Sequence, residues 1–187
     1  AEAFGVSFDA IDRKSEKAVA IRLTTPGRHN VSNALAAIGA AVAAGVPFDI
    51  AAAALSEFKG VKRRFEFVGE ANGITVIDDF AHNPDKIAAT LRTLHEFPGR
   101  VLIMFQPHGY GPLKKMKKEF IDCFASHLNA EDILLIPEPV YFGGTVDRDI
   151  GSEIIAAGVR ERGRNAHAFA SRDECAEELL KLAKPGD

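Results

Sequence analysis

The sequence contains only two cysteines among its 187 residues, Cys123 and Cys175, which lie far apart in the chain. Neither belongs to a CxxC pair or to a Cys/His cluster. Disulfide frameworks and structural zinc sites need several suitably spaced cysteines, so the sequence indicates neither of them. We expect two buried or unreactive thiols.

An excess of positive charge is also absent, because 23 lysines and arginines face 26 aspartates and glutamates and give a net charge of −3. Proteins that attract nucleic acid or anionic membranes through their overall field carry a positive excess. We therefore expect no nucleic-acid and no membrane partner. Any anionic ligand must be held by a local site.

The given residues also contain no apolar run long enough to span a membrane, and they do not open with the pattern of a leader peptide. The alanine-rich stretch 34–54 is interrupted by Gly45 and Pro47, and no basic segment followed by an apolar one opens the sequence. With 47% hydrophobic and 26% charged residues, the chain can bury a sizeable core. These features predict a cytoplasmic protein.

Common catalytic signatures are not found either. No glycine is followed by lysine, so the phosphate loop GxxxxGK[ST] is absent, and neither GxSxG nor HExxH occurs. The chain as given therefore carries no Walker-type phosphate loop.

The hydrophobic pattern predicts an α/β protein. A hairpin (4–11 and 18–23) and two helices (29–44 and 48–58) precede a second hairpin (65–70 and 74–78) turned by Asn72-Gly73. Helices over 84–96, 113–127, 149–162 and 172–182 then alternate with strands over 100–105, 132–136 and 166–169. This order predicts a Rossmann-like, doubly wound, mostly parallel sheet with helices on both faces. The first hairpin resembles the tail of a larger unit and the final turn normally feeds another strand, so we expect a fragment.

Ligands of such sheets lie at the carboxyl ends of the strands, which directs attention to the loops 78–84, 106–112 and 137–146. In the first loop, Asp78, Asp79 and His82 precede Pro84, which marks the start of a helix whose N-terminus favours an anion. The alternative is that one aspartate only caps this helix. The third loop contains Gly143-Gly144-Thr145, which lacks the pattern of a phosphate cradle.

The second loop brings further polar groups to the same edge. It contains His108 and Tyr110, and its two glycines, Gly109 and Gly111, permit close approach of a ligand. Lys114 and Lys115 follow in the predicted first helical turn, where they oppose the helix dipole unless an anion is near. A solvated helix face is the alternative for these lysines. His95, His127 and His167 are expected to be structural or exposed.

Adjacent arginines precede the second hairpin. If Arg63 and Arg64 lie in a strand, their guanidinium groups point to opposite faces and only one can reach a given site. Arginine binds phosphate in a bidentate manner, so this one is a candidate phosphate ligand. The alternative is a surface ion pair with Glu66 or another carboxylate.

Four segments, in order and spacing, resemble the Mur ligases, and most closely the branch that joins L-alanine to UDP-N-acetylmuramate. They are 25–37 (TPGRHNVSNALAA), 58–66 (FKGVKRRFE), 76–84 (VIDDFAHNP) and 105–108 (FQPH). The resemblance implies that residues 1–60 are the end of the central ATPase domain and 61–187 the C-terminal Rossmann-like domain, without its final strand.

The resemblance further implies ATP and Mg²⁺ as cofactors, with the Mg²⁺ ligands and the phosphate-loop lysine in the missing part and no metal ligand in this chain. Its implied nucleotide contacts are to adenine (His29, Asn30, Asn33), to phosphate (Arg64), to ribose (Asp79) and by aromatic packing (Phe80). It also places His82, as the catalytic residue, and the His108 loop with Tyr110 in the region that receives the incoming amino acid. The partners are then UDP-N-acetylmuramate and an amino acid or short peptide.

One departure concerns the acceptor. The alanine-adding branch reads roughly PHRYxR where this chain has Pro107-His108-Gly109-Tyr110-Gly111-Pro112, so two arginines associated with the amino acid carboxylate are absent. Either Lys114 or Lys115 replaces them, or the acceptor is not L-alanine.

The expected function is an ADP-forming amide ligase of peptidoglycan synthesis that acts through an acyl phosphate and is inactive as this fragment alone. The alternatives are a ligase that adds a murein peptide and a non-catalytic nucleotide-binding module, with a folylpolyglutamate-type ligase more remote.

Overall fold

The computed structural model describes residues 5–141, 143 and 148–187. They form two compact units, the first made of Ala1–Phe67 with Ile77–Phe80 and the second of Val68–Val76 with Ala81–Asp187. The predicted boundary at residue 60 separates two domains of the family and not these compact units, so it stays a prediction. Gly144 and Thr145 of the glycine-rich loop lie outside the described residues.

The first unit opens with the predicted hairpin. Strands β1 (Val6–Asp12) and β2 (Lys17–Leu23) pair antiparallel, with Val6 opposite Leu23 and Asp12 opposite Lys17. The Asp12 carboxylate accepts hydrogen bonds from the Ser15 hydroxyl and the Lys14 amide across the turn, and these bonds lower the pKa of Asp12.

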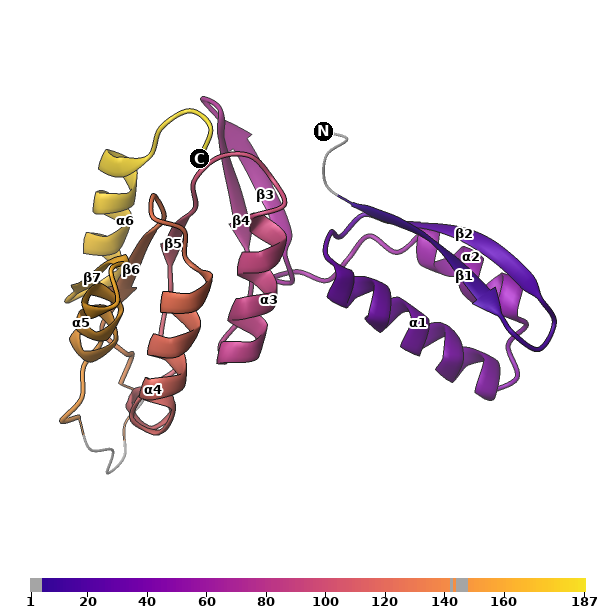
Figure 1. The fold of residues 1–187 in the computed structure, drawn as a ribbon, viewed down its shortest axis with the longest axis horizontal. Helices are drawn as coiled ribbons and strands as arrows, with labels where there is room; N and C mark the ends of the chain where they lie inside the picture. The colour runs from indigo at the N-terminus through magenta and orange to yellow at the C-terminus, as the bar shows by residue number, and fades with distance from the viewer. Residues whose placement is uncertain (1–4, 142, 144–147) are drawn as a thin grey trace. The chain divides into compact units, whose positions relative to one another are not determined.

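Two helices pack against this hairpin (Figure 1). Helix α1 (Arg28–Ala43) ends before Gly45, whose φ of 95° is a left-handed conformation suited to glycine, and Pro47 precedes helix α2 (Phe48–Ser56). The shared core is built from small and aliphatic side chains: Ala10, Ile21, Leu23, Ala34, Ile38, Ala51 and Ala52. Alanines allow the two helices to approach the sheet closely because they add little volume between backbones.

Strands β3 (Glu66–Ala71) and β4 (Ile74–Asp78) form the second predicted hairpin. The turn residues Asn72 and Gly73 both have positive φ, 54° and 74°, which is the requirement of a type I′ turn. The prediction from the Asn-Gly pair is confirmed.

The second unit contains a parallel sheet in the order β5 (Leu102–Met104), β6 (Ile133–Pro137), β7 (Asn165–Phe169). Helices α3 (Pro84–Leu94), α4 (Tyr110–His127) and α5 (Glu153–Glu161) share one hydrophobic core with it, and α6 (Arg172–Leu182) packs on a separate cluster (Figure 1). Alternate residues of β6 serve the two cores, since Leu134 and Ile136 belong to the first and Ile133 and Leu135 to the second. The predicted α/β sheet with helices on both faces is confirmed.

Both cysteines are buried. Burial raises the pKa of each thiol to about 11, so the reactive thiolate is scarce near neutral pH. Cys123 Sγ also contacts the Pro84 carbonyl oxygen at 3.2 Å. The expectation of two unreactive thiols agrees with this environment.

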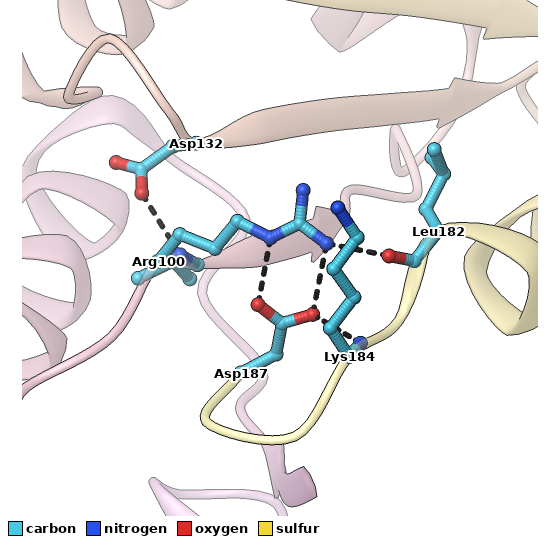
Figure 2. Close-up of polar contacts among 6 residues, drawn as sticks. Arg100, Asp132, Leu182, Lys184 and Asp187 are labelled. Atoms are coloured by element: carbon cyan, nitrogen blue, oxygen red, sulfur yellow. Dashed lines mark hydrogen bonds and ion pairs between the residues drawn. The ribbon is translucent and has the colours of Figure 1, made fainter.

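An ion pair between Arg100 and Asp187 holds the last residues of the chain against the rest of the second unit (Figure 2). Arg100 donates from Nε to Asp187 Oδ1 (2.7 Å) and from Nη2 to Oδ2 (3.0 Å), and the Leu182 carbonyl accepts from the same Nη2. Asp187 Oδ2 also accepts the Lys184 amide (2.7 Å). Hydrogen bonding by Arg100 lowers the pKa of Asp187. The turn after α6 is therefore held by side chains as well as by its backbone.

Among the described residues, no helix is long and apolar enough to cross a bilayer. Within the same residues, no group of three histidine, cysteine or carboxylate side chains could hold a metal ion.

Candidate functional site

The basic segment before β3 is a turn and not part of the strand. Arg63 and Phe65 both have left-handed φ values, 60° and 49°, and the strand begins only at Glu66. The prediction that the two guanidinium groups lie on opposite faces of a strand is wrong, because left-handed residues break the alternation on which it depended. Each such non-glycine residue costs about 1–2 kcal/mol, so contacts elsewhere must stabilise the turn.

Three successive backbone amides of this turn each have an acceptor. The Arg63 N–H donates to Glu66 Oε2 (2.7 Å), the Arg64 N–H to the Val61 carbonyl (3.1 Å) and the Phe65 N–H to Asp79 Oδ1 (3.3 Å). In return, the Phe80 N–H donates to the Arg63 carbonyl oxygen (2.8 Å). The end of β4 and the arginine turn thus fix each other.

The turn places both arginines on one aromatic ring. The guanidinium carbon lies 4.8 Å from the Phe80 ring centroid for Arg63 and 5.5 Å for Arg64, within the range of cation–π attraction. Arg63 Nε also pairs with Asp78 Oδ2 at 3.4 Å. The alternative of a surface ion pair with Glu66 or another carboxylate is therefore confirmed for Arg63, with Asp78 as the partner. This pair is solvent-exposed and therefore weak.

An open pocket of the first unit lies beside this cluster. Its lining comes from the segment before α1, with Thr24, Thr25 and Pro26, and from residues 59–62 and 64–67. Lys59, Lys62 and Arg64 give it three cationic side chains against one carboxylate, that of Glu66. A site of this composition favours an anionic ligand.

The three residues expected to meet adenine lie at the start of α1. Asn30 Nδ2 donates to the carbonyl oxygen of Pro26, which lines the pocket, at 2.7 Å, and Asn33 Nδ2 lies 3.5 Å from Asn30 Oδ1. His29 and Asn30 are half-buried and Asn33 is exposed. Asn30 therefore fixes the turn that leads from the pocket into the helix.

In the second unit, two imidazoles come together. The ring centroids of His82 and His108 are 6.1 Å apart, although the residues follow different strands. Asn83 is the N-cap of α3, with its side chain accepting the Lys86 amide at 3.0 Å. This excludes the alternative in which Asp78 or Asp79 caps the helix.

Helix α4 begins at Tyr110, three residues earlier than predicted, after Gly109 with a φ of 132°. Lys114 and Lys115 are exposed and fall in its second turn, so the prediction that they lie in the first turn is wrong. Pro112 fits near the helix start because its missing N–H would have no partner there. The lysines therefore oppose the helix dipole less than the sequence suggested.

The remaining histidines have structural partners or lie at the surface, as predicted. His95 Nε2 contacts the buried Asp132 at 2.8 Å, and His127 lies between the Cys123 carbonyl (2.9 Å) and Arg92 (3.1 Å). His167 is exposed on β7.

The structure adds residues that sequence reasoning did not assign. Arg63 lies over the Phe80 ring together with Arg64. The Arg-Arg pair was visible in the sequence, but the predicted strand allowed only one of the two arginines to face the site. Arg148 lies over Tyr141 at 4.2 Å from the ring centroid, a contact for which the sequence contained no signal. The nucleotide candidates of the sequence analysis, from His29 to Phe80, fall in the first unit, and the acceptor candidates, from His82 to Lys115, in the second.

Comparison with known proteins places the chain in a family. Residues 63–187 match the family model described as "Mur ligase, glutamate ligase domain". The UDP-N-acetylmuramate–L-alanine ligase of Gluconobacter oxydans is 38% identical over 98% of this chain and 39% of its own length. The chain spans 32–39% of the length of the curated relatives that it matches, which is about a third of each.

Solved structures show the same likeness. The UDP-N-acetylmuramate–alanine ligase of Thermotoga maritima has a TM-score of 0.62 at 28% identity, covering 90% of this chain and 37% of its own. A murein peptide ligase of Psychrobacter arcticus has a TM-score of 0.63 at 27% identity, covering 100% and 38%. The chain therefore belongs to the Mur ligase family.

Proposed function

We propose that the full-length protein is an ATP-dependent, ADP-forming amide ligase of peptidoglycan synthesis. It joins an amino acid or short peptide to UDP-N-acetylmuramate. The observation that carries the proposal is the 38% identity with a UDP-N-acetylmuramate–L-alanine ligase over nearly the whole chain. The converging arginines, the cationic pocket and the paired histidines are consistent with it. The cytoplasmic location stays a prediction.

The proposed reaction has two steps. The substrate carboxylate attacks the γ-phosphorus of ATP, which releases ADP and gives an acyl phosphate; the acceptor amine then attacks the acyl carbon, and inorganic phosphate leaves as the amide forms. Catalysis of such steps is mainly positioning and stabilisation of charge. Mg²⁺ would neutralise phosphate charge, and its ligands are expected outside these residues.

On the nucleotide side, the donor set of the first unit fits a polyphosphate. We assign Arg64 to a phosphate, Asp79 to the ribose, Phe80 to packing beside the nucleotide, and His29, Asn30 and Asn33 to adenine. Guanidinium groups keep their charge at all working pH values and can bind phosphate oxygens in a bidentate manner.

On the acceptor side, we assign His82 and His108 to the incoming amine, with Tyr110 beside them. An imidazole at the attacking amine can hold the proton that the amine loses as the amide forms. We expect His82→Ala to lower kcat/KM for the acceptor by 100-fold or more, on the order of the usual contribution of such a group, and to leave the KM for ATP unchanged. His167→Ala is the matched control, because His167 is exposed on β7. Equal kcat/KM for both variants and wild type would remove His82 from the reaction.

The acceptor is either L-alanine or a murein peptide. Lys114 or Lys115 is the candidate partner for the acceptor carboxylate in the first case. The first case is favoured by the 38% identity with a UDP-N-acetylmuramate–L-alanine ligase. The second is supported by the likeness to a murein peptide ligase over the whole chain, and by Gly111, where an added Cβ would meet nothing within 4 Å.

The experiment is phosphate release by the full-length protein with constant UDP-N-acetylmuramate and ATP, and with L-alanine, other amino acids and murein peptides in turn. Turnover with L-alanine supports the lysine assignment, which Lys114→Ala and Lys115→Ala then test. Turnover only with a peptide would indicate that the loop 106–112 selects the acceptor. ATP binding without any turnover would support a non-catalytic nucleotide-binding module instead.

A further inference from the structure

The contacts around Asp79 give this residue a second role, which rests on the proposed function. We propose that Asp79 is a positioning residue for a two-arginine polyphosphate site. It holds the left-handed turn that brings both Arg63 and Arg64 onto Phe80. The Phe80 ring then supports both guanidinium groups, and Arg63 contacts the polyphosphate together with Arg64.

The first step of the argument is the conformation of the turn. Arg63 and Phe65 have φ values of 60° and 49°, which side-chain-bearing residues rarely adopt. A backbone of this kind persists only where surrounding contacts hold it. The contact on Phe65 comes from Asp79, 14 residues later in the chain, at 3.3 Å.

The second step concerns what else Asp79 could do. Its Oδ1 is already used by the Phe65 amide, and Phe65 is a buried residue with only 5% of its surface exposed. The adjacent Phe80 amide binds the Arg63 carbonyl at 2.8 Å. Asp79 and Phe80 therefore each form a hydrogen bond to one of the two left-handed residues of the turn. Loss of the Asp79 carboxylate removes the hydrogen bond to Phe65 directly.

The third step is electrostatic. Two guanidinium groups near one ring repel each other, and this arrangement is stabilised by the ring face, by Asp78 at 3.4 Å from Arg63 and by the fixed turn. Two like charges held close together form a site suited to a ligand with several negative charges. Lys59 and Lys62, which line the pocket together with Arg64, extend the same positive surface.

The test uses a ligand without ribose. Inorganic tripolyphosphate competes with ATP for the full-length protein, and its affinity is measured for wild type, Asp79→Ala, Asp79→Asn and Arg63→Gln. We expect Asp79→Ala and Arg63→Gln to weaken tripolyphosphate by about tenfold each, the loss of one charge-assisted contact. Asp79→Asn should stay within about twofold of wild type, because the amide oxygen of asparagine can still accept the Phe65 N–H.

Two further measurements separate positioning from ribose binding and from misfolding. Asp79→Ala combined with Arg63→Gln should weaken tripolyphosphate little more than either change alone, since both act on the same site. Glu70→Gln, which removes an exposed carboxylate from β3, is the matched control and should match wild type in affinity and in melting temperature.

The outcomes are distinct. Unchanged tripolyphosphate affinity in Asp79→Ala, with weaker ATP binding, would show that Asp79 acts only on the ribose and would overturn the inference. Equal losses in Asp79→Ala and Asp79→Asn would also overturn it, because the carboxylate charge would then matter and not the hydrogen bond. Failure of the wild-type protein to bind ATP would refute the proposed function itself, and this inference with it.

Discussion

The ion pair between Arg100 and Asp187 gives the sharpest stability prediction. The side chains are only 17% and 7% exposed, and two hydrogen bonds of 2.7 and 3.0 Å join them (Figure 2). Asp187→Asn keeps the size of the side chain but removes its charge and turns one amide N–H toward the donors of Arg100. Removing one partner of a buried pair costs about 3–5 kcal/mol, because the remaining charge is left uncompensated.

The assay is native-state hydrogen exchange of peptides from α6, whose end is held by this pair through the Leu182 carbonyl. We expect the opening free energy of α6 to fall by about 3 kcal/mol, which corresponds to exchange roughly 100-fold faster. Glu178→Gln is the control, because the pair of Glu178 with Lys181 is exposed and such pairs contribute at most about 1 kcal/mol. A change no larger than that of the control would refute the assignment of Arg100 and Asp187 as a stabilising pair.

The pH dependence supplies an independent check. The pKa of Asp187 in the folded state is lowered from 3.8, mainly by hydrogen bonding from Arg100. Its contribution to stability is therefore fully present above about pH 4 and is lost as the pH falls through the folded pKa. Asp187→Asn should remove this dependence, so wild type and variant should converge in acid. A constant difference between them down to the acid limit would contradict the reasoning.

Three further predictions concern local packing and chemistry. Asn83→Ala should destabilise α3 by about 1 kcal/mol in urea denaturation, whereas Asn83→Ser should retain most of the stability because serine also caps helices. Native Cys123 and Cys175 should react with a thiol reagent at pH 7.5 far more slowly than in the unfolded chain; rapid native labelling would contradict their raised pKa of about 11 and their burial. Gly158→Ala should lower the melting temperature, because its Cβ would lie 2.5 Å from Ile121 Cδ1 between α5 and α4, with Gly163→Ala as a comparison at an open but left-handed position.

Local sequence determined much of the fold. The Asn72-Gly73 pair specified its hairpin, because two adjacent residues able to adopt positive φ are what a type I′ turn needs. The alternation of helix and strand patterns predicted the parallel sheet, and four short segments were enough to indicate the Mur ligase family. These are properties of neighbouring residues, which steric preference and hydrophobic period fix without reference to distant contacts.

The tertiary structure decided the arrangement of the candidate site. Arg63 and Phe65 would not be left-handed by their own preference; acceptors and donors from the end of β4 hold them there, and this overrules the strand pattern of the Arg-Arg segment. Likewise, the pairing of His82 with His108, and of Arg100 with Asp187, joins residues that only chain folding brings together. A short-range pattern identifies the residue types that can carry a chemistry. Contacts between distant segments decide which of them meet, because those contacts supply the free energy that strained or like-charged arrangements require.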